Sequence, residues 1–461
     1  MEKDKAQMSN PLGQEKIGKL LVSYSVPVII AVLINAIYNI VDQIFIGHGV
    51  GPVGNAATTV TYPIVTVVSA LGSWLGGGGT TYAAIKLGQG NKDEAEKTFN
   101  NLFVVTFLVG VVIAVVTIIF LSPILKLAGA LDDVVSYAKT YSSIILIGVP
   151  FNMVSLSLSG LARVDGNPRI SMYGMIAGAV LNTILDPIYI FAFHWGVAGA
   201  ALATITSQII SAGIIVYYFA KKSNFLRFQV ANMKLQSNIV KEIIVLGTSS
   251  GIIQFVAVVM QLVMNNSLVH YCKAAGVSVS VALGGMGVAL KILMIFASLC
   301  MGLGIGAQPI IGFNYGAKQY LRIREAFVKA CIGATVSITI GWILCQTIPH
   351  TLAAMFGKQS QEFISFTAKC IKIYLGGMFA VGFEIIATNY FQATKQPLKA
   401  SVLSLLRQLI LLVPLLIILP HFFGLNGILF SGMIADISSA IIIGMFIIPE
   451  IIQLGKKAQE S

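Results

Sequence analysis

The stretch LLVSYSVPVIIAVLINAIYNIVDQIFI, residues 20–46, decides the fold of this chain. Most of its side chains are apolar, and it is longer than the roughly 20 residues that an α-helix needs to cross a bilayer. One carboxylate, Asp42, interrupts it near its carboxyl end. A surface helix of a soluble protein alternates apolar and charged faces, and this stretch does not. It therefore predicts a membrane-spanning helix that carries an ionisable group.

The rest of the chain continues this pattern. Of the 461 residues, 56% are hydrophobic and only 10% are charged, whereas soluble domains carry about a quarter charged residues. The polar connections are too short to hold a soluble domain. We expect an all-α polytopic membrane protein with twelve transmembrane helices, at about residues 20–46, 57–85, 99–121, 137–160, 170–193, 197–220, 241–268, 279–309, 326–348, 368–392, 399–419 and 425–450.

The basic residues are distributed unevenly between the two sides of these spans. With the amino terminus inside, 22 of the 30 Lys and Arg residues fall in inner segments and six in outer ones. The positive-inside rule then predicts a multi-pass protein of the cell inner membrane with both termini in the cytoplasm. The net charge of +12 is explained by an anionic lipid surface, so we expect the bilayer as a partner and no nucleic acid. Residues 1–19 lack the apolar core of a cleavable signal peptide.

An internal repeat divides the chain at an offset of about 227 residues. Matching segments follow equivalent spans: Gly90-Asn91-Lys92 with Gly316-Ala317-Lys318, Asp165-Gly166-Asn167-Pro168 with Thr394-Lys395-Gln396-Pro397, and Trp195-Gly196 with Phe423-Gly424. Because each half has six spans, the halves are parallel repeats, a plan that secondary transporters use. We expect two pseudo-symmetric six-helix bundles: an N-lobe over 1–220, a basic cytoplasmic linker over 221–241 and a C-lobe over 242–461.

Ionisable side chains inside spans are costly and therefore informative. The second half holds Glu384 and Asp436 together with two bases, Lys291 and Arg407, so its charges can form a structural ion-pair network or contact substrate. The first half holds Asp42 and Asp186 and no base within its spans. A proton or an external cation must therefore neutralise these two acids, unless each is kept permanently neutral by neighbouring polar groups.

Polar neighbours surround both acids of the first half. Asn35, Tyr38, Asn39 and Asp42 recur at helical spacing, and Asn182 lies one turn before Asp186. Pro187 cannot donate a hydrogen bond to the preceding turn, so the helix can kink there, and Pro27 can bend the first span in the same way. An oxygen-rich pocket of this kind suits Na⁺ or a shared proton.

No motif of an enzyme appears. Gly76 to Gly79 lacks the Lys and Ser or Thr of a phosphate loop, and the five cysteines follow no metal or disulfide spacing. We therefore expect no enzymatic activity, no resident metal and no cofactor apart from a coupling ion. Methionines within the spans, Met286 among them, can form an adaptable wall for varied ligands or plain packing contacts.

Several segments resemble the multidrug and toxic compound extrusion (MATE) family over nearly the whole chain. They are residues 27–47, Gly88-Gln89-Gly90-Asn91, the stretch from Arg163 to Pro168, the stretch from Leu181 to Pro187, and Gln308-Pro309-Ile310-Ile311-Gly312. The last two are similar to the DinF-like branch and its MepA-like bacterial members. The resemblance implies the MATE (MOP-superfamily) fold and export of cationic amphipathic drugs or dyes in exchange for H⁺ or Na⁺, by a monomer.

The resemblance also implies a cation site in the N-lobe. Its carboxylates correspond to Asp42 and Asp186, and its polar ligands to Asn182, Thr204 and Asn152. The NorM-like branch carries a carboxylate in the seventh span, where this chain has only Gln254 and Gln261. Two other functions remain open: a flippase for lipid-linked saccharides, which would need a cationic cleft, and a passive channel.

Overall fold

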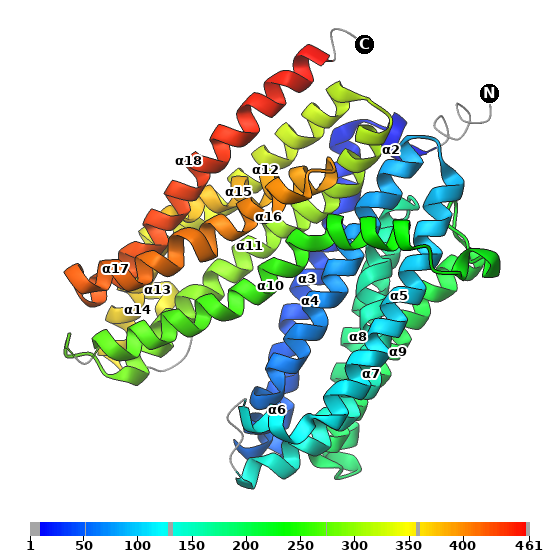
Figure 1. The fold of residues 1–461 in the computed structure, drawn as a ribbon. Coiled ribbons are helices and arrows are strands. Elements are labelled where there is room, and N and C mark those ends of the chain that lie inside the picture. Colours follow the sequence, from blue (N-terminus) through cyan, green and yellow to red (C-terminus); the bar gives the residue numbers. More distant parts are fainter. Residues whose placement is uncertain (1–9, 51, 128–131, 273, 356–359, 458–461) are drawn as a thin grey trace. The chain divides into compact units, whose positions relative to one another are not determined.

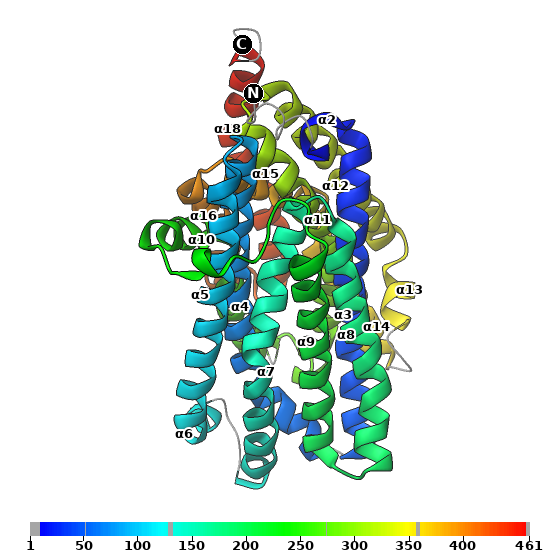
Figure 2. The same cartoon turned by 90° about the vertical axis from the view of Figure 1, so that its right-hand side faces the viewer.

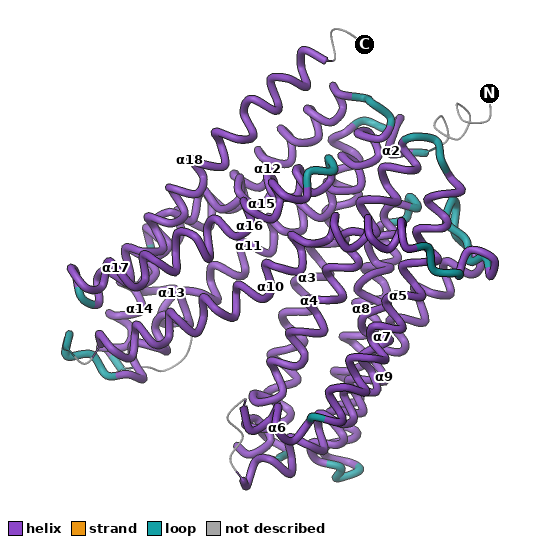
Figure 3. The backbone as a smooth tube through the Cα atoms, in the orientation of Figure 1, coloured by secondary structure: helices purple, strands orange, loops and turns teal. Residues whose placement is uncertain are grey.

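The computed structural model describes residues 10–50, 52–127, 132–272, 274–355 and 360–457. Within these ranges the chain forms helices joined by short loops and contains no strand (Figure 3). Twelve of its helical stretches are long and apolar enough to cross a membrane. They are Ile17–Asn35, Ala56–Gly88, Lys92–Ile119, Val134–Val164, Pro168–Ala192, Gly196–Lys221, Ser237–Cys272, Val281–Gly316, Tyr320–Thr347, Gln361–Ala393, Pro397–Phe423 and Leu425–Lys457. The predicted all-α polytopic fold is confirmed.

The helices of the first half are α2 (Pro11–Gln14), α3 (Ile17–Gly49), α4 (Pro52–Gly88), α5 (Lys92–Ile119), α6 (Leu121–Leu127), α7 (Asp132–Val164), α8 (Pro168–Pro187), the π-helix η1 (Ile188–Ala192) and α9 (Gly196–Lys221). After the 3-10 turn η2 (Val230–Met233) come α10 (Ser237–Cys272), α11 (Val279–Gly316), α12 (Tyr320–Thr347), α13 (Pro349–Ala354), α14 (Gln361–Tyr374), η3 (Leu375–Ala380), α15 (Val381–Ala393), α16 (Pro397–Leu405), the π-helix η4 (Leu406–Leu412), α17 (Val413–Phe423) and α18 (Leu425–Lys457). Several helices extend beyond the predicted spans because their polar ends project past the apolar window.

Two of the three matched turns agree with the internal repeat, whereas in the first the left-handed residues are Gly90 and Lys318, so Gly90 corresponds to Lys318 and not to Gly316. Gly166 and Lys395 occupy equivalent positions, and both adopt the left-handed conformation, with φ of 91° and 58°. Gly196 and Gly424 are a second such pair, with φ of 54° and 57°. Glycine adopts this conformation without strain, whereas the side chain of Lys395 makes it costly. The same backbone turn is therefore kept in both halves even where the residue type has changed.

Contacts gather the chain into two compact units, and helices α3, α10 and α11 contribute to both. Unit 1 contains Met1–Glu15, Val26–Gln254 and Gly312–Ala317. In this unit α7 packs against α4, α5, α8 and α9 (Figures 1 and 2). Its core is apolar and includes Ile46, Ile145, Ile190 and Val197.

Unit 1 also holds the first half of α10, which packs against α4 through glycines. A Cβ atom on Gly78 would lie 1.8 Å from the carbonyl oxygen of Ile243, and one on Gly247 would lie 1.9 Å from that of Trp74. Nε1 of Trp74 donates a hydrogen bond to the carbonyl oxygen of Ile244 at 2.8 Å. Compact unit 1 therefore runs past residue 241, and the proposed lobe boundaries at 220 and 242 stay a prediction.

Unit 2 contains Lys16–Ser25, Phe255–Ile311 and Lys318–Ser461. Here α18 packs against α17, η3, η4 and α14, while α12 packs against α15. Large apolar side chains on the outer faces of α12 and α18 are exposed, including Ile332, Val336, Ile441 and Met445. Such faces suit contact with lipid acyl chains rather than with water.

Three buried polar side chains fix the segment between the two repeats. Asp165 is fully buried, and its carboxylate accepts hydrogen bonds from the hydroxyl of Tyr218 at 2.6 Å and from the backbone amides of Asn224, Phe225 and Leu226 at 2.8, 2.7 and 2.8 Å. Burial raises the pKa of this carboxyl group, while these hydrogen bonds act in the opposite direction.

The other two side chains hold the segment further along. The side chain of Asn100 donates a hydrogen bond to the carbonyl oxygen of Arg227 and accepts one from the backbone amide of Gln229. The side chain of Asn101 likewise donates to the carbonyl oxygen of Asn232 and accepts from the backbone amide of Gln236. The segment is therefore bound to unit 1 along most of its length.

Replacing Asp165 with Asn should lower the free energy of unfolding by about 1–3 kcal/mol, because the new amide group faces donors and leaves buried amides unsatisfied. Thermal unfolding of the purified protein in detergent measures the change. Asp93→Asn is the matched control because Asp93 is largely exposed and pairs with Lys97 one turn away. Equal unfolding temperatures in the two variants would contradict the anchoring role of Asp165.

Candidate functional site

A buried polar cluster in unit 1 is built around the end of α8. Nδ2 of Asn182 lies 3.3 Å from Oδ1 of Asp186 and 3.4 Å from Oγ1 of Thr204 on α9. Asp186 and Asn182 are almost completely inaccessible, and Thr204 is 8% exposed. The structure thus brings together these three residues that the sequence analysis placed in one cation site.

Asp42 on α3 completes the acidic pair. Its side chain is 8% exposed, and its carboxyl group acts on that of Asp186 both as a charge and as a hydrogen-bonding group. Tyr38, one helical turn earlier, lies within electrostatic range of both acids. Two carboxyl groups from different helices therefore face each other inside the unit, where mutual repulsion and desolvation disfavour two full charges.

Pro187 changes the helix directly beside this pair. The α-helical geometry of α8 ends at Pro187, and the π-helix η1 follows, with a bond from the amide of Phe193 to the carbonyl oxygen of Ile188. The predicted interruption at Pro187 thus takes the form of a widened turn. Short π-helical segments are frequent at functional sites.

The oxygen atoms of the cluster suit a small hard cation or a proton. Oδ2 of Asp186 and Oδ1 of Asn182 are buried and receive no hydrogen bond from any donor in the described part of the chain. Buried oxygens of this kind normally have a partner. No group of three or more His, Cys, Asp or Glu side chains suited to a metal ion occurs in the described ranges. The chemistry of the donor set therefore matches Na⁺ or H⁺ better than a transition metal.

Tyr141 on α7 also belongs to the cluster, and the sequence alone does not predict it. Its hydroxyl group acts on the side chain of Thr204 and lies within electrostatic range of Asp42 and Asp186. Its ring packs in the apolar core, where it is 8% exposed. A tyrosine in the outer third of an apolar span usually indicates interfacial packing, so no local signal separated this one from the others.

Replacing Tyr141 with Phe should raise the concentration of coupling ion needed for half-maximal efflux by up to about tenfold. The ring packing stays, while the polar hydroxyl group beside the acids is lost, and a group of this kind contributes about 0.5–1.5 kcal/mol when it takes part in hydrogen bonding. Efflux from vesicles, titrated with H⁺ and with Na⁺ in separate series, measures the shift. Tyr137→Phe is the control because Tyr137 lies one turn away on α7 and is 44% exposed. An unchanged titration in Tyr141→Phe would remove this residue from the site.

Other predicted residues lie outside the cluster. Asn152 lies eleven residues beyond Tyr141 on α7, or about 16 Å along the helix axis, and its place in the site stays a prediction. Asn35 is exposed on α3, and Gln254 is half-buried on α10. The side chain of Asn39 lies outside the described part of the structure.

The ionisable groups of the second half form a separate cluster in unit 2. Nε of Arg407 lies 2.6 Å from Oδ1 of Asp436 and 3.7 Å from Oε2 of Glu384. Lys291, the second base expected in this network, is exposed on α11 and makes no ion pair with any described residue. The expected network is therefore corrected to one base and two acids. Lys291 does not take part in the ion-pair network because the buried face of α11 carries its neighbours Ala289 and Ile292.

Two further residues singled out in the sequence are Met286 and Pro27. Met286 is only 1% exposed and packs within the protein, and its role in an adaptable wall for ligands stays a prediction. Pro27 lies within α3, two residues after the point where contacts divide that helix between the two units. Its role as a bend stays a prediction.

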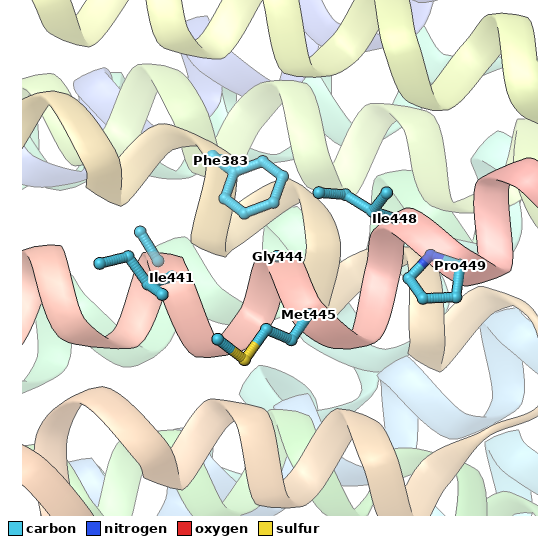
Figure 4. A pocket seen from close by; sticks show the side chains of 7 residues that line it. Phe383, Ile441, Gly444, Met445, Ile448 and Pro449 are labelled. Carbon is cyan, nitrogen blue, oxygen red and sulfur yellow. The ribbon is translucent and has the colours of Figure 1, made fainter.

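An apolar groove of about 540 Å³ lies between α15 and α18. Phe383, Ile441, Met445 and Ile448 line it with Gly444 and Pro449 (Figure 4). No charged side chain borders this groove, and several of its side chains are among the exposed apolar residues. Its chemistry suits an acyl chain and not an ion.

Twelve spans in two repeated halves, with acids buried inside the spans, define a polytopic membrane transporter. A family model described as MatE matches residues 27–188 and 240–418. The chain therefore belongs to the MatE family, the multidrug and toxic compound extrusion family of membrane transporters.

Its relatives are similar along nearly their whole length. The multidrug export protein MepA of Staphylococcus haemolyticus is 29% identical over 441 residues, which cover 94% of each chain. MepA of Staphylococcus aureus is 28% identical over 424 residues, covering 91% of this chain and 90% of the relative. These relatives are named as export proteins and not as enzymes, in agreement with the absence of an enzymatic motif in the sequence.

Solved structures show the same fold. A MOP superfamily transporter from Pyrococcus furiosus superposes with a TM-score of 0.89 at 22% identity, over 96% of this chain and 98% of that one. A multidrug resistance MATE family transporter in an outward-facing conformation superposes with a TM-score of 0.88 at 21% identity, over 98% of both chains. At this level of identity the likeness concerns the fold alone.

Proposed function

We propose that this MatE-family protein is a multidrug efflux antiporter that exports cationic amphipathic compounds in exchange for H⁺ or Na⁺. The coupling ion binds at Asp42 and Asp186. The observation that carries this proposal is the pair of buried carboxyl groups in unit 1 that act on each other, with Asp42 and Asn182 as the groups that act on Asp186. Such a pair is stable only with a proton or cation between its members.

Binding of the ion changes the charge of the cluster and thereby the packing of the helices around it. Asp42 lies on α3, and Asp186 lies at the end of α8 beside the π-helix η1. Neutralisation lets α3 pack more closely against α8, whereas release of the ion restores repulsion. Each monovalent cation that moves inward supplies about 2.3 kcal/mol per 100 mV of membrane potential.

The orientation of the chain in the membrane follows from the uneven distribution of its basic residues. With 22 basic residues in inner segments and six in outer ones, both termini face the cytoplasm and the carboxyl end of α8 points outward. The acidic pair then lies in the outer half of the bilayer, where external ions reach it first. The transporter works as a monomer, because each chain carries both repeats.

A flippase for lipid-linked saccharides remains the alternative. Such a protein needs a cationic surface for a pyrophosphate group, and Lys291, exposed on a spanning helix, is one described side chain that suits it. A single lysine is a weak anion site compared with the buried acidic cluster of unit 1. A passive channel has no use for two repeated halves with a buried ion site.

Ethidium efflux from vesicles, with Na⁺ and pH gradients imposed separately, tests the proposal. We expect one of the gradients to drive ethidium against its concentration gradient, and an ionophore that collapses this gradient to stop transport. Downhill movement alone would indicate a channel. Absence of ethidium transport together with transfer of a fluorescent lipid-linked saccharide between leaflets would favour the flippase.

A further inference from the structure

The charged cluster of unit 2 contains more acid than base. Glu384 on α15 is 5% exposed and Asp436 on α18 is 2% exposed, and both face Arg407 on the π-helix η4. One guanidinium cannot balance two ionised carboxylates. With both acids ionised, the cluster would hold an uncompensated negative charge inside a membrane protein, which is strongly unfavourable.

The surrounding elements supply no second base among the described residues. Tyr374 on α14 is the remaining titratable group within electrostatic range of Arg407. Lys369 and Lys372 on α14 are exposed. Helix α12 packs against α15 and presents apolar residues, including Ala334, to Gly382.

More distant bases on the neighbouring helices do not change the net charge of this cluster. Lys399 on α16 is directed to Glu450, at 3.7 Å between Nζ and Oε2. The charged residues of α12 lie in its first three turns, more than a turn before the contact with Gly382, and are Arg322, Arg324, Glu325 and Lys329. The negative charge must therefore be removed by a proton.

The distances indicate which acid holds this proton. Nε of Arg407 contacts Oδ1 of Asp436 at 2.6 Å but lies 3.7 Å from Oε2 of Glu384. The guanidinium is therefore the direct partner of Asp436, and this pair is electrically neutral. Glu384 is left as the acid without a full counter-charge.

Ser439 can serve both states of Glu384. Its hydroxyl group contacts Oε1 of Glu384 and also lies 3.1 Å from the backbone carbonyl oxygen of Asp436. When Glu384 is ionised, Ser439 donates its hydrogen to the carboxylate. When Glu384 is protonated, Ser439 donates to the carbonyl oxygen, which only accepts, and receives a hydrogen bond from the carboxyl group. The same geometry is therefore satisfied with and without the proton.

We propose that Glu384 is a second proton-binding site of this transporter, with the Asp436–Arg407 pair as its fixed neighbour and Ser439 as its adaptable hydrogen-bond partner. The site is separate from Asp42 and Asp186 and binds its proton whether or not those residues couple transport. Its position beside a π-helix matches that of the first-half site beside η1, so each half of the repeat carries an ionisable group next to an irregular fifth span.

Infrared difference spectroscopy of the purified full-length protein, recorded between acidic and alkaline pH, tests this proposal. The pair Asp42 and Asp186 can contribute an aspartate band, so the diagnostic signal is the band of a protonated glutamate, identified by carbon-13 labelling of glutamate. We expect this glutamate band at acidic pH and expect it to disappear at alkaline pH. Glu384→Gln and Asp436→Asn should each abolish this band, because each leaves one acid for one base. A proton count with a pH indicator should fall by about one per chain in both variants. Asp42→Asn should leave the band in place.

Two further measurements keep the test decisive if a variant fails to fold. Carbon-13 labelling of glutamate in the wild-type protein should shift the band, whereas labelling of aspartate should not. Ser439→Ala should move the midpoint of the titration while keeping the band. A glutamate band that survives in Glu384→Gln, or a wild-type protein without any glutamate band, would overturn the proposal.

Discussion

Replacing Asp186 with Asn should reduce ion-driven efflux by roughly ten- to a hundredfold while the protein still folds. The amide keeps the hydrogen-bond distance to Asn182 but carries neither a charge nor an exchangeable proton. Contacts to charged groups contribute about 1.5–3 kcal/mol, which corresponds to this range of ion affinity. Asp42→Asn should have an effect of the same order, because each substitution leaves one acid where the ion needs two.

Initial rates of dye efflux from energised vesicles, normalised to the amount of folded protein, measure this effect. Asp93→Asn is the control because it makes the same chemical change on an exposed surface of α5. Drug binding in the absence of a gradient should persist in Asp186→Asn. Efflux at the wild-type rate in this variant would exclude Asp186 from coupling.

Replacing Gly78 with Ala should destabilise unit 1 by about 3 kcal/mol or more. The new Cβ would lie 1.8 Å from the carbonyl oxygen of Ile243 and 2.8 Å from the amide nitrogen of Gly247, both of them backbone atoms. Neither can turn aside as a side chain does, so α4 and α10 must separate and lose their packing. The loss of monodisperse protein on heating in detergent measures the effect.

Gly213→Ala on α9 is the matched control, because no atom lies within 4 Å of the position that its Cβ would occupy. Alanine is a better helix former than glycine by about 1 kcal/mol. The same substitution should therefore stabilise the protein at residue 213 and destabilise it at residue 78. Equal changes at both positions would show that α4 and α10 do not pack as closely as described.

The spans and the acidic pair could be predicted from the sequence for physical reasons. A spanning helix requires a continuous apolar stretch, which is visible in one dimension. A carboxylate within such a stretch is so costly that Asp42 and Asp186 stood out without any three-dimensional information. Asn182 followed from Asp186 by helical spacing alone.

The remaining features depend on contacts between distant segments. Tyr141 reaches Thr204 from another helix, and its sequence neighbours resemble those of any interfacial tyrosine. For Lys291 and Arg407 the depth in the span was clear, but the face of the helix was not, and only Arg407 turned inward. The π-helical segments depend on packing around the fifth spans, which local propensity does not report.

The anchored segment between the repeats has a consequence for how the chain can be assembled. Its hydrogen bonds attach it to helices that precede it, whereas α10, which follows it, is held by its own contacts with Trp74 and Gly78. Covalent continuity just before α10 is therefore dispensable for the final contacts. Two fragments translated from separate messages, divided between residues 236 and 237, should associate in the membrane and restore transport by complementation.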